Sequence, residues 1–209
     1  MEELKNKFEQ GLKSCPVVAI LRGITPEEVE NVCKFFADAG INLLEIPLNT
    51  PRALESIAIA AKCISENQMV GAGTVLTAQA VRDVKQAGGQ FIISPNTDEN
   101  VIRETKACNM LSMPGCFTVT EAFIAQNAGA DYLKVFPVGS IGANYIKDIK
   151  AVVKMPFMAV GGVNLDNMAD FLKCCAGVGI GGALYKPGKP WEDFCRDTEN
   201  FVKIAQSMN

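Results

Sequence analysis

The sequence alternates between strand-like and helix-like patterns along almost its whole length. Short apolar, β-prone runs predict buried strands at residues 17–21, 42–46, 69–73, 91–94, 110–113, 132–136, 157–160 and 178–180. Segments of helical periodicity predict a helix after each strand, at residues 26–38, 51–65, 77–87, 98–107, 118–128, 143–153, 165–174 and 190–206. Eight such units in 209 residues predict an α/β fold of the small (β/α)8, or TIM, barrel type.

An additional helix is predicted before the first strand. Leu4, Phe8 and Leu12 follow one another at four-residue intervals, which predicts an amphipathic helix at residues 2–12. No linker or low-complexity segment interrupts the repeat, so we expect one domain over residues 1–209, with this N-terminal helix in residues 1–12.

Several residues signal where helices begin. Thr25-Pro26 and Thr50-Pro51 each place a capping threonine before a first-turn proline, and Thr118 and Glu121 have the spacing of a capping box. At the other end, Ala-Gly pairs predict left-handed caps before alternate strands, at residues 39–40, 87–88, 128–129 and 176–177.

The Ala-Gly repeat also predicts which side chains share a layer inside the barrel. Counting five residues from each glycine reaches Glu45, Ile93, Lys134 and Gly182. Because alternate strands of such a barrel contribute to one layer, we expect Glu45 and Lys134 to point inward at similar height. A buried structural salt bridge is the alternative to a catalytic pair.

Lys134 lies in the middle of the apolar run Tyr132–Phe136. Burial of an ammonium group lowers its pKa, and an amine that is neutral near pH 7 is a nucleophile toward carbonyl groups. A lysine that reaches solvent at a strand end, or that pairs with a carboxylate, is the alternative interpretation of the same pattern.

Charge and composition argue against several classes of partner and location. The net charge is −3 without a basic block, which argues against nucleic acid as a partner, and no apolar run has membrane-spanning length. The first residues lack the apolar core of a signal peptide, so we expect a cytoplasmic protein.

The sequence contains no histidine, which excludes Ser-His and Cys-His pairs and histidine-bound zinc. Its eight cysteines lie mostly in apolar patterns without a Cys-x-x-Cys motif, so we expect them to be structural, with no metal site.

Polar residues and glycines follow most of the predicted strands. They include Arg22, Thr74 and the segment Ser94-Pro95-Asn96, and the pairs Gly161-Gly162 and Gly181-Gly182 follow the last two strands. Active sites of this fold lie at the carboxyl ends of the strands, and phosphate commonly binds after strands seven and eight. Glycines that only permit tight turns are the alternative interpretation.

Six short motifs occur in order along the chain: Ile20-Leu21-Arg22-Gly23, Glu45-Ile46-Pro47-Leu48-Asn49, Gly71-Ala72-Gly73-Thr74-Val75, Ile93-Ser94-Pro95-Asn96, Lys134-Val135-Phe136-Pro137 and Gly161-Gly162-Val163. Together, from about residue 15 to 186, the chain resembles the class I 2-keto-3-deoxy-6-phosphogluconate/4-hydroxy-2-oxoglutarate aldolases. The first two motifs look most like the 2-keto-3-deoxy-6-phosphogalactonate aldolase branch.

The resemblance implies a role for each candidate residue. Lys134 would form a Schiff base with C2 of a phosphorylated keto acid, and Glu45 would be the general acid and base. Arg22 and Thr74 would hold the pyruvyl carboxylate. The remaining residues would cradle the phosphate (Gly161, Gly162, Gly181 and Gly182) or shape the pocket (Pro95, Phe136 and Val160). The products would be pyruvate and glyceraldehyde 3-phosphate, without a metal or other cofactor, and family members are commonly homotrimers.

The chain departs from the family pattern at two places. Many gluconate-branch members have arginine at the position of Asn49, and the family usually has a serine in the loop that reads Gly181-Gly182-Ala183 here. The alternatives that stay open are a 4-hydroxy-2-oxoglutarate aldolase, a phosphate-binding barrel isomerase or epimerase, and a barrel that binds a metabolite without turnover.

Overall fold

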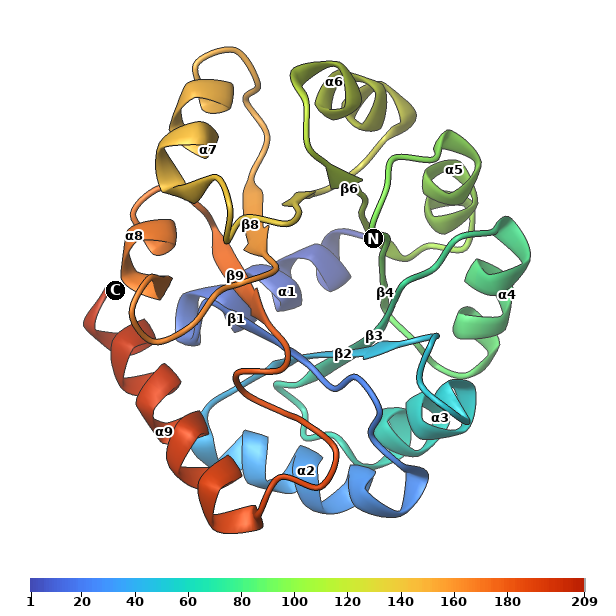
Figure 1. Cartoon of the computed structure of the whole chain (residues 1–209). Helices are drawn as coiled ribbons and strands as arrows, with labels where there is room; N and C mark the ends of the chain where they lie inside the picture. The colour runs from blue at the N-terminus through green and yellow to red at the C-terminus, as the bar shows by residue number, and fades with distance from the viewer. Residues whose placement is uncertain (209) are drawn as a thin grey trace.

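The computed structural model describes residues 1–208, which form a nearly closed barrel of parallel strands surrounded by helices (Figure 1). The described strands are β1 (Val17–Ile20), β2 (Leu43–Pro47), β3 (Met69–Gly73), β4 (Phe91–Ile93), β5 (Leu111–Met113), β6 (Gly115–Cys116), β7 (Leu133–Val135), β8 (Phe157–Val160) and β9 (Gly177–Ile180). Their order in the sheet is β5-β4-β3-β2-β1-β9-β8-β7-β6. The predicted TIM-barrel fold is confirmed.

The two ends of this strand order are joined by a single residue of the chain. Pro114 separates β5 from β6, so the two strands are one segment that pairs with β4 before the proline and with β7 after it. The amide of Lys134 donates to the Pro114 carbonyl at 2.9 Å. The fifth predicted strand, at residues 110–113, therefore corresponds to β5, and β6 continues it beyond the proline.

The helices lie around the barrel of strands, apart from the N-terminal helix, which lies across one end of it (Figure 1). Those described in residues 1–208 are α1 (Glu2–Ser14), α2 (Pro26–Ala39), α3 (Ala53–Cys63), α4 (Ala78–Gln86), α5 (Glu99–Ala107), α6 (Val119–Ala128), α7 (Gly142–Lys150), α8 (Met168–Leu172) and α9 (Trp191–Ser207). One apolar core lies between strands and helices, and a second fills the barrel interior. Among the described residues, no helix combines the length and the apolar composition needed to cross a membrane.

The predicted N-terminal helix is α1, which lies across one end of the barrel (Figure 1). The ring of Phe8 is fully buried and contacts Phe91 and Tyr132, with ring centroids 5.4 and 4.9 Å apart. Because these partners belong to the barrel interior, α1 closes the end of the barrel where the strands begin.

The predicted helix ends agree with the structure where local chemistry decides them. Thr25 and Thr118 cap α2 and α6 with complete capping boxes, and Gly40 and Gly129 are left-handed C-caps.

Two of the predicted capping signals are wrong. α3 begins at Ala53, because the Thr50 hydroxyl accepts a hydrogen bond from the Gly23 amide rather than capping a helix. Gly177 is not a left-handed cap but the first residue of β9, where a Cβ atom would lie 2.8–2.9 Å from Met158, Leu12 and Pro16.

Candidate active site

Lys134 is the central residue of β7 and is only 6% exposed. Its neighbours Leu133 and Val135 are fully buried and point into the layer between strands and helices. By strand alternation the Lys134 side chain points into the barrel. Its Nζ lies 4.9 Å from the centroid of the Phe136 ring, close enough for a cation–π contact when the amine is protonated.

Glu45 is the middle residue of β2 and is 1% exposed. Its carboxyl group extends across the neighbouring strand to Gly73, and its Oε2 atom is buried without a hydrogen-bond partner. A buried carboxyl oxygen without a partner is costly, and such groups gather at functional sites.

Lys134 and Glu45 influence each other electrostatically. Burial lowers the pKa of Lys134, the Glu45 carboxyl opposes this shift, and the Arg22 cation adds to it. Burial raises the pKa of Glu45, while the Lys134 and Arg22 cations oppose that shift. The site therefore favours a neutral amine next to a protonatable carboxyl, which suits nucleophilic attack and proton transfer.

A cavity of about 360 Å³ opens above Lys134 at the carboxyl ends of the strands. Every predicted site residue except Glu45 lines it: Arg22, Thr74, Pro95, Lys134, Phe136, Val160, Gly161, Gly162, Gly181 and Gly182. Glu45 is buried outside this lining and interacts electrostatically with Lys134 and Arg22, which both line the cavity. One cavity thus brings together groups from six strand ends.

The two glycine pairs differ in their backbone requirements. Gly161 and Gly162 have φ of 88° and 86°, and a Cβ at Gly162 would lie 2.8 Å from Cα of Gly139. Both positions therefore need glycine. The φ angle of Gly182 lies outside the left-handed region, and a Cβ atom there would meet nothing within 4 Å.

Thr74 adopts a left-handed conformation with φ of 54°, which is uncommon for a β-branched residue. It directly follows β3 and lines the cavity. Backbone strain of this kind costs about 1–3 kcal/mol and is concentrated at binding and active sites.

Sequence reasoning missed several residues of the cavity. Ile20, Val163, Asn164, Gly179 and Ala183 also line it. Strand alternation places Ile20 on the same face as Arg22, so that signal was present in the sequence. Asn164 lies in a loop, where the side-chain direction has no periodic signal.

No group of three or more Cys, Asp or Glu side chains within residues 1–208 is arranged to hold a metal ion. The eight cysteines are free thiols, most of them buried or half-buried among apolar residues.

Comparison with known proteins identifies the family of the barrel. Residues 8–196 match the family model described as "Aldolase: KDPG and KHG aldolase". The chain is 41% identical to the 2-dehydro-3-deoxy-6-phosphogalactonate aldolase of Escherichia coli strain K12, over 90% of this chain and 93% of that protein.

Two solved structures are similar over most of the chain. The native KDPGal structure has a TM-score of 0.89 at 40% identity, over 92% of this chain and 95% of that one. A cube-shaped protein cage, designed by fusing symmetric oligomeric domains, has a TM-score of 0.89 at 40% identity, over 93% of this chain and 73% of that one. The chain belongs to the KDPG and KHG aldolase family.

Proposed function

We propose that this enzyme is a Schiff-base aldolase that cleaves 2-keto-3-deoxy-6-phosphogalactonate to pyruvate and glyceraldehyde 3-phosphate. The proposal rests on one observation. Buried Lys134 lines a cavity at the carboxyl ends of the strands, and it interacts electrostatically with the buried carboxyl group of Glu45. The similarity to a 2-dehydro-3-deoxy-6-phosphogalactonate aldolase supports this substrate.

The chemistry begins with the neutral amine of Lys134, which attacks C2 of the keto acid and forms an iminium ion with loss of water. Glu45 takes the proton of the C4 hydroxyl, directly or through a water molecule. The C3–C4 bond then breaks, its electrons pass into the iminium to give an enamine, and the aldehyde leaves. Protonation at C3 and hydrolysis of the imine release pyruvate and free Lys134.

The rest of the cavity binds the substrate. Arg22 and Thr74 hold the pyruvyl carboxylate near Lys134, while Pro95, Phe136 and Val160 form the walls. Backbone amides of the two glycine pairs, Gly161-Gly162 and Gly181-Gly182, bind the phosphate, because glycine lets an anion approach the backbone closely.

Borohydride reduction in the presence of pyruvate tests the covalent step. Peptide mass spectrometry should find reduced pyruvate on Lys134, and Lys134→Met should abolish labelling. Labelling of another lysine, or an active enzyme that is never labelled, would contradict the mechanism. Glu45→Gln should still be labelled at saturating pyruvate, but aldol turnover should fall by about 10²–10⁴, the usual range for acid–base catalysis.

A second candidate substrate is 4-hydroxy-2-oxoglutarate, which has no phosphate. The observation that favours it is that Gly181, Gly182 and Ala183 offer no side-chain donor where a phosphate would bind. The values of kcat/KM for the phosphorylated galactonate and gluconate substrates, for their unphosphorylated forms and for 4-hydroxy-2-oxoglutarate would identify the preferred substrate.

The proposal extends to the working form of the enzyme: one catalytic domain, free of metal and other cofactors, that acts as a homotrimer in the cytoplasm. Free thiols suit a reducing compartment. The cage built from symmetric oligomeric domains supports an oligomer, as do the exposed apolar residues Phe117, Val119 and Phe123. Light scattering should give a mass three times 22.4 kDa, and full activity should survive chelators.

A further inference from the structure

Arg22 reaches the cavity from a loop rather than from a strand. It lies two residues beyond the end of β1 and is exposed, so packing alone does not fix its long side chain. Its Nη1 donates a hydrogen bond to Oδ1 of Asn49, at 2.5 Å. Asn49 is an exposed residue of the loop that follows β2. The Asn49 side chain thus orients the Arg22 guanidinium.

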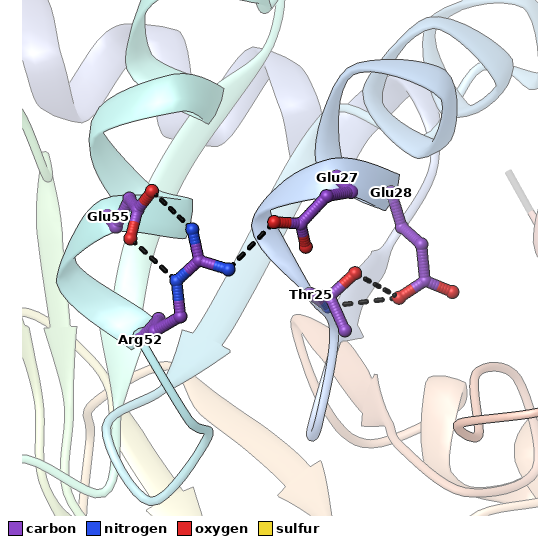
Figure 2. Close-up of polar contacts among 5 residues, drawn as sticks. All are labelled: Thr25, Glu27, Glu28, Arg52 and Glu55. Carbon is purple, nitrogen blue, oxygen red and sulfur yellow. Dashed lines mark hydrogen bonds and ion pairs between the residues drawn. The ribbon is translucent and has the colours of Figure 1, made fainter.

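Two further contacts hold these loops and the helices that follow them together. The Gly23 amide donates to Oγ1 of Thr50 at 2.9 Å, directly after the contact between Arg22 and Asn49. Farther out, Arg52 bridges Glu27 on α2 and Glu55 on α3, with Nη1 2.7 Å from Glu27 Oε1 (Figure 2). The loop after β2 therefore holds the loop after β1 at two successive positions and the start of α2 at a third, and the Asn49 contact lies nearest the cavity.

The chemistry of the Asn49 acceptor matters as much as its position. An amide oxygen is neutral, so it directs the guanidinium without cancelling its charge. None of the ion pairs found among residues 1–208 includes Arg22. The cation is therefore available to a carboxylate ligand, and it also contributes to lowering the pKa of Lys134.

We propose that Asn49 is a positioning residue that directs Arg22 toward the carboxylate of the keto acid while leaving its charge uncompensated. The inference rests on the proposed function, because it takes the carboxylate-binding role of Arg22 from it. The inference adds Asn49, a residue outside the cavity lining, to the proposed site. It also explains why the acceptor of the Arg22 hydrogen bond should be neutral.

Borohydride trapping of pyruvate in the intact enzyme tests this role, because it separates the half-saturating pyruvate concentration from the trapping rate at saturation. Asn49→Leu should raise the half-saturating concentration about three- to tenfold, the scale of one hydrogen bond. The saturated rate should change less than about twofold, since Lys134 and Glu45 stay in place. Asn31→Leu, at an exposed position on α2, is the matched control and should change neither value.

Asn49→Asp keeps the shape of the side chain and adds a charge. The new carboxylate should pair with Arg22 and compete with pyruvate, so the half-saturating concentration should rise about tenfold or more. Pairing also offsets the cation that lowers the pKa of Lys134, so the pH at which trapping begins should move upward. A purely structural role for Asn49 would predict no such shift.

Arg22→Met and the double variant with Asn49→Leu complete the test. If Asn49 acts through Arg22, the double variant should bind pyruvate no more weakly than Arg22→Met alone. Independent effects that add, or an Asn49→Leu enzyme with unchanged half-saturation, would overturn the inference while leaving the aldolase proposal intact. A wild-type enzyme that is never labelled by pyruvate would instead refute the proposed function, and this inference with it.

Discussion

The carboxyl group of Glu45 occupies the space that a side chain at Gly73 would fill. A Cβ atom at Gly73 would lie 1.7 Å from Oε1 of Glu45, far inside any real contact distance. The two residues are on paired strands, with Pro47 of β2 opposite Gly73 of β3. The carboxyl that we propose as the acid–base group is therefore placed by the absence of a side chain on the next strand.

Gly73→Ala should consequently displace the Glu45 carboxyl and lower aldol turnover by about 10²–10⁴, as loss of the acid–base group would. Labelling by pyruvate at saturation should change far less, because Lys134 is on a different strand. Gly71→Ala is the control for stability, since a Cβ atom there meets Phe91 instead. Steady-state kinetics and thermal melts of both variants would separate a loss of turnover from a loss of stability. Turnover near the wild-type value in Gly73→Ala would contradict this placement of Glu45.

The pH dependence of imine formation should shift in opposite directions in two variants. Burial lowers the pKa of Lys134, Glu45 raises it and Arg22 lowers it, and only the neutral amine attacks a ketone. Glu45→Gln should therefore extend trapping to lower pH, whereas Arg22→Met should restrict it to higher pH. Initial trapping rates from about pH 5 to 10 would measure this. Shifts in the same direction would show that these charges do not act on Lys134.

Substrate choice between epimers should depend on Val160, which is 5% exposed and lines the cavity. An apolar side chain gives no hydrogen bond to a C4 hydroxyl directed at it, so we expect a preference for the galactonate substrate. Val160→Thr should move the ratio of kcat/KM values toward the gluconate substrate by a few-fold to about tenfold, the scale of one neutral hydrogen bond. Unchanged ratios, or a wild-type preference for gluconate, would assign the selection to other residues.

A hydroxyl added at Gly182 should strengthen phosphate binding. A Cβ atom is accommodated there without contacts, so Gly182→Ser should lower KM for phosphorylated substrates about tenfold, as expected for a hydrogen bond to a charged group. KM for 4-hydroxy-2-oxoglutarate should not improve. Gly162→Ser should have the opposite effect, because φ of 86° and the backbone of Gly139 leave no place for a side chain. Equal effects of Gly182→Ser on both substrate classes would contradict the assignment.

The N-terminal helix should contribute to stability without taking part in catalysis. Phe8→Ala removes a fully buried ring from the barrel interior and should lower the free energy of unfolding by about 3–5 kcal/mol. Pyruvate labelling at 25 °C should persist in the folded fraction. Leu54→Ala, at a side chain of α3 that is 39% exposed, serves as the comparison in chemical denaturation. A small effect at Phe8 would show that α1 does not close the barrel.

The fold could be predicted because periodicity and helix caps are local properties of the sequence. The pairing of Glu45 with Lys134 followed from counting residues after Ala-Gly pairs, although the Gly177 cap used in that count is wrong. The count succeeded because both side chains have the same orientation relative to the barrel axis.

Features that depend on side-chain contacts outside the periodic segments could not be predicted. The helix expected at residues 165–174 is shortened to α8, because Asn164 and Asn167 form a hydrogen-bonded turn. The Arg22–Asn49 contact joins two loops 27 residues apart, and loops carry no periodic signal. Neither the turn nor the contact leaves a pattern in the sequence that distinguishes it from other polar segments.

Pro114 divides the chain between the two groups that we propose as the catalytic pair. Glu45 on β2 lies before it, Lys134 on β7 lies after it, and outside this segment the β1–β9 pairing connects the two sets of strands. A chain cut at Pro114 would give two fragments, each with one residue of the proposed catalytic pair. Fragment complementation should therefore restore aldol cleavage only when both pieces reassemble, so catalysis itself would report the closure of the barrel.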